Sequence, residues 1–347
     1  MKELALQIKE KALSLGYAGC GIKKVDDVAE YGVKLKERMS RVRFGKLQFG
    51  QFKKFAKPQK ANKWAKSIIV VLNDNTGYNI PEKLKGLYGK DYLIDGRLDS
   101  KSDGFMRRVA LTKYLKELGI KSSNEPRFGI TALRWAADKA GLGIVRANNF
   151  FYSENGSAIT IDAWIIDEEL ELIDAVELRK CPEHCGKCIE ACPTKALQAP
   201  FTTSLFDCVS FITTISVENG LGMPSKKHVN EIGCRVYGCD ICQDVCPFNK
   251  DKWIGGSDFP GLNEMADKLL PERIMAMDYS EIERELAPKF WYIGVRNLWK
   301  WKINALVAMS NAYSDAYEDA IKLGLTDTEL RVRRFAKKVC KKHAINY

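Results

Sequence analysis

Two cysteine-rich stretches decide the fold of this chain: CPEHCGKCIEACP at residues 181–193 and CRVYGCDICQDVCP at residues 234–247. Each stretch carries four cysteines, and each ends in Cys-Pro. A [4Fe–4S] cluster is held by four thiolates, and in bacterial ferredoxins the cysteine of the terminal Cys-Pro serves the other cluster. The two stretches therefore predict a pair of [4Fe–4S] clusters with crossed ligation.

Crossed ligation assigns seven of the eight expected ligands. The first cluster is expected to take Cys181, Cys185, Cys188 and Cys246. The second is expected to take Cys192, Cys239 and Cys242. Spacing leaves the eighth ligand open, because Cys234 continues the second stretch while Cys208 lies between the two stretches. A structural zinc pair would explain the paired Cys-x2-Cys turns, but not the further cysteines and Cys-Pro in both stretches.

The cysteine count supports a metal centre rather than a disulfide framework. Nine of the eleven cysteines fall between Cys181 and Cys246, whereas secreted disulfide scaffolds are usually much shorter than 347 residues. No apolar run approaches the length of a membrane span. The N-terminal residues are charged every few positions and lack a signal-peptide core, so we expect a cytoplasmic protein without a membrane partner.

Hydrophobic patterning predicts an α+β fold in three parts. Residues 1–175 are expected to form an α/β domain with helices over Met1–Leu15, Phe105–Leu118 and Ile130–Ala140 and strands over Gly19–Ile22, Ser67–Leu72 and Ala158–Ile166. Residues 176–255 are expected to fold around the clusters as a ferredoxin-like domain. Residues 256–347 are expected to form a short HEAT-like helical region, with helices over Ile303–Met309, Ser314–Leu323 and from Thr326 or Thr328 onward.

Positive charge is concentrated in two segments of a chain whose formal net charge is +11. Residues 34–66 contain twelve Lys or Arg against one acid, Glu37, with aromatic residues between them. Residues 331–342 contain seven Lys or Arg and no acid. These basic clusters are either solvated surfaces or contacts for a polyanion, with RNA as the first candidate.

With these residues in view, the chain resembles the epoxyqueuosine reductase family and its corrinoid relatives, the reductive dehalogenases. The resemblance is carried by Tyr237–Asn249, by Ala140-Gly141-Leu142-Gly143 with Asn148, by Gly156-Ser157 and by Gly89–Tyr92. It implies Cys208, followed by Val-Ser-Phe, as the eighth ligand in place of Cys234. It also implies that the C-terminal helices meet tRNA.

The same resemblance implies a base-off cobalamin. An external donor of the flavodoxin or ferredoxin type would reduce the clusters, which would pass electrons to the corrinoid that reduces the substrate. No lower-ligand motif surrounds His184, His228 or His343, the three histidines of the chain. The residues implied in corrinoid binding are Gly141, Leu142, Gly143, Arg146, Asn148, Gly156 and Ser157.

Two departures from the family pattern concern catalysis. Where the queuosine enzymes have a proton-donating Asp, this chain has Ser123, which cannot act as an ordinary general acid near neutral pH. Glu125 and Asp91 are the candidates to replace it, with Tyr92 and Asp95 behind them. The family's Gly-Lys-Asn after Gly-Leu-Gly is altered to Arg146-Ala147-Asn148.

Three functions therefore compete. The first is a cobalamin-dependent reductase that acts on epoxyqueuosine in tRNA. The second is a corrinoid reductase of a small electrophile, which the missing Asp favours. The third is a non-enzymatic two-cluster electron carrier, although 347 residues are many more than a carrier requires.

Overall fold

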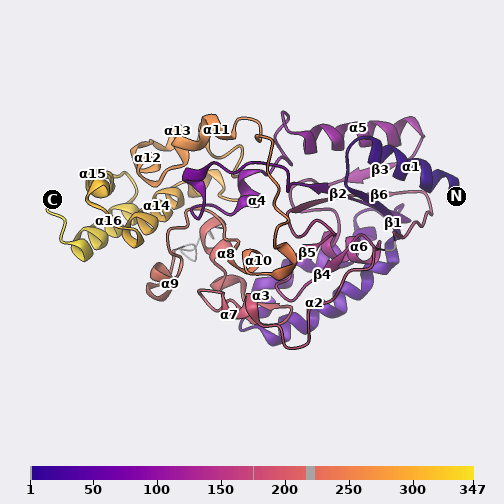
Figure 1. The fold of residues 1–347 in the computed structure, drawn as a ribbon, viewed down its shortest axis with the longest axis horizontal. Helices are drawn as coiled ribbons and strands as arrows, with labels where there is room; N and C mark the ends of the chain where they lie inside the picture. Colours follow the sequence, from indigo (N-terminus) through magenta and orange to yellow (C-terminus); the bar gives the residue numbers. More distant parts are fainter. Residues whose placement is uncertain (1, 175, 216–222) are drawn as a thin grey trace.

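A four-stranded antiparallel sheet forms the centre of the N-terminal part of the chain in the computed structural model, which describes residues 2–174, 176–215 and 223–347 (Figure 1). Its strand order is β1 (Gly19–Lys24), β2 (Ser67–Asp74), β6 (Ile159–Ile166) and β3 (Ser122–Asn124). β2 and β6 pair along their whole length, from Ser67 opposite Ile166 to Asp74 opposite Ile159. Ile and Val fill β2 because branched side chains pack well on a pleated surface.

Helices cover both faces of this sheet. Successive side chains of a strand point to opposite faces, so Ile69 and Val71 join one core and Ile68 and Val70 the other. The first core is closed by α1 (Lys2–Ser14) and α5 (Asp103–Glu117). The second is closed by α6 (Leu133–Lys139), and Figure 1 places it with α2 (Ala29–Arg41) below the strands.

The strands and helices expected in this part are present, with shifted ends. The helix expected from Ile130 begins at Leu133, because Thr131 is buried and donates its hydroxyl to the carbonyl of Phe55. α2 was not expected, since its residues were considered only for their charge. Met1 and Ala175, the limits of the first expected domain, lie outside the described residues.

The remaining helices and strands of residues 2–270 are short and connect the cluster segment to its surroundings. They are α3 (Gly45–Phe49), α4 (Lys90–Leu93), β4 (Ile144–Val145), β5 (Phe151–Tyr152), α7 (Lys187–Glu190), β7 (Leu197–Ala199), β8 (Thr202–Thr203), α8 (Val209–Thr214), α9 (Lys226–Glu231), α10 (Ile241–Asp244) and α11 (Leu262–Met265). None of the helices in the described ranges is long and apolar enough to cross a membrane.

The C-terminal part is a group of helices packed around α14 (Trp299–Asn311), of whose thirteen residues twelve are buried. A helix that is apolar on all sides belongs inside a protein. Around it lie α12 (Pro271–Ala276), α13 (Tyr279–Glu285), α15 (Glu318–Leu323) and α16 (Leu330–His343). The helix expected from Thr326 or Thr328 begins at Leu330, so the acids Asp327 and Glu329 precede its first turn.

A buried ion pair joins α14 to the segment before α16. Lys302 Nζ lies 2.8 Å from Asp327 Oδ2, and the two side chains are 8% and 3% exposed. The hydroxyl of Tyr279 donates to the other carboxylate oxygen at 2.7 Å. Removal of one partner of such a pair leaves an uncompensated charge in the protein interior.

We expect Asp327→Asn to lower the free energy of unfolding by about 3–5 kcal/mol, because Lys302 would keep its charge without a counter-ion. The exposed Asp319→Asn in the first turn of α15 is the matched control, with an expected loss under about 1 kcal/mol. Anaerobic denaturant unfolding followed by circular dichroism measures both variants. Equal losses would show that the Lys302–Asp327 pair contributes nothing specific.

Candidate functional site

The two cysteine stretches fold as matching turns. α7 holds Cys188 and α10 holds Cys242, and in each stretch the earlier cysteine of the Cys-x2-Cys pair lies just before the helix. Proline follows Cys192 and Cys246, which come directly after the two helices. Because proline cannot continue a helix, each helix ends before the last cysteine of its stretch.

The thiols gather into two groups. Burial and the nearby Cys246, Cys181 and Cys185 raise the pKa of Cys188. Burial raises the pKa of Cys242, and the nearby Cys208 and Cys239 raise it further. Burial also raises the pKa of Cys208, and the nearby Cys192 adds to that shift. Crossed ligation requires these neighbours: Cys246 beside the first stretch, and Cys192 beside the second.

The other three cysteines lie apart from these groups. Cys234 lies near Tyr317, beside the C-terminal helices. Burial raises the pKa of the Tyr317 phenol, and the nearby Cys234 contributes to that shift. Cys20 is buried in the core that α1 and α5 close, and Cys340 is buried in the C-terminal core. The structure thus brings Cys208, and not Cys234, to the second group.

The chemistry of this donor set fits iron–sulfur clusters. Thiolates gathered so closely repel one another, and a cationic iron core relieves that repulsion. Among the described residues, no three His, Cys, Asp or Glu side chains are arranged to hold a single metal ion.

A polar network anchors the second stretch to the N-terminal part. Asn148 Nδ2 donates to the carbonyl of Cys242 at 3.0 Å and to the hydroxyl of Tyr152 at 2.9 Å. Ser157 Oγ donates to Gln243 Oε1 at 2.7 Å and accepts from Asn249 Nδ2 at 2.8 Å. Asn148 and Ser157, both expected to contact a corrinoid, thus hold the cluster segment, and corrinoid contact stays a prediction for them.

Close backbone contact positions Asp91 beside this segment. Gly89 donates its N–H to the carbonyl of Tyr237, and a Cβ on Gly89 would lie 3.0 Å from the backbone nitrogen of Cys239. Gly238 has a φ of +81°, and a Cβ there would lie 2.4 Å from the ring of Tyr92. Two glycines are therefore required where α4 passes the second cysteine stretch.

The Asp91 carboxyl has the properties of an acid held for proton transfer. Burial, and after it the neighbouring Asp240 carboxylate, raise the pKa of Asp91 to about 7. Its carboxyl accepts no hydrogen bond from a described residue. Asp91 and Asp240 line one hollow of about 470 Å³, part of it open to solvent, together with Lys90 and Ser157.

A group of polar side chains, called the wall below, extends from Asp91 toward α2 and α6. Arg134 is exposed to solvent, and desolvation by the surrounding protein lowers the pKa of its guanidinium. Asp91, Tyr92 and Tyr31 act electrostatically on Arg134, so they border the same space. Arg38 joins them, because it and Arg134 both donate to Asn149.

The second group of cysteines borders this space as well. Tyr92 hydrogen-bonds Ser210 at 2.7 Å, two residues after Cys208. The Cys208 thiol is one of the causes, after burial, that raise the pKa of Tyr92. Sequence analysis singled out neither Arg134, Arg38 nor Tyr31. The spacing of Tyr31 and Arg38, which puts them on one face of a helix, was the available signal.

Glu125 and Ser123 lie in a different setting. Glu125 is exposed and accepts the backbone N–H of Arg127 in a turn. Ser123 lies in β3 opposite Ile165 of β6. Asp91 is therefore half-buried, whereas Glu125 is exposed.

The glycines implied in corrinoid binding are required by packing within the protein. Gly141 has a φ of +73°, and a Cβ there would lie 1.5 Å from the carbonyl oxygen of Asp174. A Cβ on Gly143 would lie 2.2 Å from the carbonyl of Tyr152, and one on Gly156 2.6 Å from Asn249. Leu142 is buried in the core beneath the sheet. Their contact with a corrinoid stays a prediction.

The histidines offer no lower ligand near this wall. His184 is exposed, His228 lies 3.2 Å from Asp207, and the ring of His343 stacks on Tyr313. How a corrinoid would be ligated at the wall stays a prediction.

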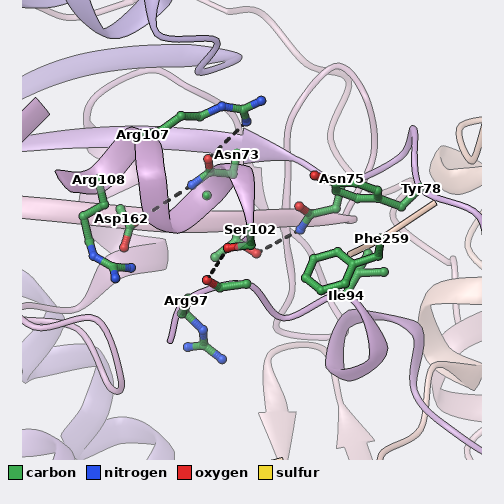
Figure 2. Close-up of a pocket in the computed structure, with 13 residues that line it drawn as sticks. Asn73, Asn75, Tyr78, Ile94, Arg97, Ser102, Arg107, Arg108, Asp162 and Phe259 are labelled. Carbon is green, nitrogen blue, oxygen red and sulfur yellow. Dashed lines mark hydrogen bonds between the residues drawn. The ribbon is translucent and has the colours of Figure 1, made fainter. Parts of the chain in front are cut away.

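A second pocket lies over the sheet and near α5, as Figure 2 shows, with Asn73, Arg107 and Asp162 in contact. Arg107 donates to Asn73 at 3.4 Å, and Asn73 donates to Asp162 at 3.5 Å. None of the cysteines and none of the expected site residues line it. This pocket is a polar space outside the candidate site.

The two basic clusters lie on the surface. In α16, Val332, Phe335, Ala336 and Val339 are buried, whereas Arg334, Lys337, Lys338 and Lys341 are exposed. In residues 34–66, eleven of the twelve Lys and Arg side chains are exposed, and Arg38 faces the wall described above. Both clusters are thus accessible to a polyanion.

Residues 180–249 match the family described as "4Fe-4S double cluster binding domain". The chain is 30% identical to the epoxyqueuosine reductase of Cellulophaga algicola over 260 residues, which are 70% of this chain and 78% of that protein. It is 31% identical to the epoxyqueuosine reductase of Prochlorococcus marinus over 265 residues, 72% of this chain and 79% of that protein.

Solved structures share the fold over nearly the whole chain. A crystal structure of selenomethionine-labelled epoxyqueuosine reductase matches with a TM-score of 0.74 at 23% identity, covering 98% of this chain and 90% of that one. A structure of epoxyqueuosine reductase with a tRNA-Tyr epoxyqueuosine-modified stem loop matches with a TM-score of 0.69 at 22% identity, covering 98% of each. The mixed α/β fold with its double-cluster domain is therefore a known one.

The eighth ligand can be tested with two matched variants. We expect Cys208→Ser to reduce the iron content of anaerobically purified protein from about eight toward about four atoms per chain, because one cluster loses a thiolate. Cys234→Ser should keep about eight. Iron analysis with an absorption spectrum measures both. The reverse pattern would make Cys234 the ligand.

Proposed function

Because this chain belongs to the epoxyqueuosine reductase family, we propose that it is an iron–sulfur reductase acting on epoxyqueuosine in tRNA. The observation that carries the proposal is the position of the second cysteine group. Cys208 lies beside Tyr92, and Tyr92 borders the same wall as Asp91 and Arg134. Electrons held by the second cluster would thus be available where a substrate is shielded from water.

Cobalamin is the cofactor that fits this wall. The accessible but poorly hydrated Arg134, with Arg38, Tyr31 and Tyr92, supplies donors and ring faces for an amide-rimmed planar group. When bound there, cobalamin would supply a cobalt centre that takes single electrons and reduces an electrophilic carbon. The tie from Arg38 and Arg134 to Asn149 would keep both guanidinium groups in place for it.

The two clusters have different positions along the proposed electron route. The first group lies beside the exposed His184 and the exposed Lys187, where a flavodoxin or ferredoxin type of donor could approach. The second group lies beside the wall. After burial and nearer groups, the Cys188 thiol also raises the pKa of Cys242. The two groups are therefore neighbours, and electrons would have a short path between them.

Asp91 is the proton donor in this proposal. Reduction of an epoxide leaves an oxygen that must take up a proton, and a general acid works best with a pKa near the operating pH. The Asp91 pKa of about 7 meets that condition, and the carboxyl lies beside the wall. This assignment replaces the acid that the family has at the position of Ser123.

The tRNA would contact the basic clusters 34–66 and 331–342. Exposed Lys and Arg side chains neutralise phosphates without reading sequence. Their accessible placement on α16 and on residues 34–66 supports such a contact. Recognition of the modified base itself would fall to the wall.

We expect Asp91→Asn to lower kcat at least 100-fold on epoxyqueuosine-tRNA, while Glu125→Gln stays within about threefold of wild type. An amide cannot donate the proton, whereas the exposed Glu125 has no part in the step. Because the donor must be protonated, wild-type kcat should fall as the pH rises through about 7. Single-turnover assays on cobalamin-loaded protein across pH 5.5–8.5 (about three units) measure the rate of each variant and its pH dependence.

The competing reductase of a small electrophile is favoured by Ser123 and has its own signature. It would reduce free epoxides or organohalides at the same Asp91-dependent rate, without tRNA affinity at low salt. If the protein is only an electron carrier, the Asp91→Asn variant should transfer electrons as fast as the wild type. A loss of turnover in Glu125→Gln alone would move the donor to Glu125.

We expect Lys337→Gln with Lys338→Gln to weaken tRNA binding and to reduce the slope of log K against log salt by about one per lost phosphate contact. The control is Lys113→Gln on α5, which removes an exposed charge outside both basic clusters. Filter binding between about 50 and 200 mM salt measures the slope. An unchanged slope in the double variant would remove α16 from the tRNA contact.

A further inference from the structure

Arg146 is a buried cation placed between the two cysteine stretches. It lies in the turn between β4 and β5, where its N–H donates to the carbonyl of Phe150 at 2.9 Å. The residue is only 3% exposed. Its Nη1 lies 4.0 Å from Cys181 Sγ in hydrogen-bonding geometry, and the guanidinium stands 3.4 Å from the ring centroid of Phe248.

The protein itself does not neutralise this charge. Arginine stays protonated in proteins, and a buried charge is unfavourable unless it is paired. Within the described residues Arg146 forms no ion pair with a carboxylate, and its Nε has no hydrogen-bond partner. The rings of Phe248 and Tyr152, the latter 5.0 Å away, offer only cation–π attraction.

A [4Fe–4S] cluster would provide the missing counter-charge. A cluster bound by four thiolates is anionic, and reduction adds one more negative charge. Cys181, which Arg146 contacts, and Cys246, two residues before Phe248, are both assigned to the first cluster.

We infer that Arg146 is the counter-charge of the first cluster and raises its reduction potential. A nearby cation and N–H···S contacts stabilise the reduced cluster more than the oxidised one, because the reduced form carries more negative charge. The inference rests on the proposed cluster assignment and deepens it.

The consequence for function is easier reduction of the first cluster by an external donor. Electrons would then collect at the first group before they pass to the second. Cys239 of the second group has Arg235 nearby, but Arg235 donates to the carbonyl of Ile232 rather than to a thiol. The direct guanidinium contact is therefore described only for the first group.

The test is an anaerobic redox titration of full-length protein followed by electron paramagnetic resonance. We expect Arg146→Met to lower the reduction potential of one cluster. At a fixed solution potential, the ratio of reduced to oxidised cluster should fall about tenfold or more, which corresponds to a shift of ~59 mV for one electron. The other cluster should not change. Arg146→Lys should restore much of the shift, since it keeps a charge. The exposed Lys180→Met, next to Cys181, should change little because solvent screens that charge.

Each outcome decides the matter. Unchanged potentials in Arg146→Met with both clusters present would overturn the inference. If Arg146→Met loses a cluster, retention of both clusters in Arg146→Lys would support the counter-charge. Loss of a cluster in Arg146→Lys as well would show that Arg146 only packs there, and would overturn the inference. An inactive wild type with both clusters and the expected Arg146 shift would sink the proposed function alone. Wild-type protein without two [4Fe–4S] clusters would refute both.

Discussion

Mutual repulsion among gathered thiolates is the constraint on which the structure depends. The thiols of the two cysteine stretches lie next to each other, and ionising them together requires a cationic metal core. The protein holds them by neutral means: the carbonyl of Cys242 accepts from Asn148, and Ser157 links Gln243 to Asn249. These contacts set the position of the thiols, while the clusters supply the charge balance.

The same contacts place the redox groups beside a space for chemistry. Gly89 and Gly238 let α4 pass close to the second stretch, and this brings Asp91 next to Asp240. The resulting loss of hydration raises the Asp91 pKa toward neutrality. Arg134 and Arg38, from helices distant in the chain, complete the wall through their shared contact with Asn149. In the proposed reaction, this one arrangement of the backbone would serve both electron storage and proton supply.

Local signals in the sequence were sufficient for the clusters and for most of the sheet. The Cys-x2-Cys turns and their Cys-Pro ends depend only on spacing, and the Ile and Val run of β2 reads as a strand in any context. The wall as a whole could not be predicted, because Arg134 meets Tyr31 and Arg38 of α2 only through tertiary contacts. Arg146 was expected to bind a corrinoid, and this stays a prediction; that its guanidinium would also reach Cys181 could not be read from the sequence. Gly141 and Gly143 are required by close backbone packing, which a motif alone does not distinguish from ligand contact.

The central claim is that this chain holds two iron–sulfur clusters next to a corrinoid site. Metal analysis of oxygen-free protein after incubation with cobalamin and removal of the excess tests it most directly. The account predicts about eight irons and about one cobalt for every chain, with little zinc. A preparation with zinc in place of iron, or with full iron but no retained cobalt, would contradict it.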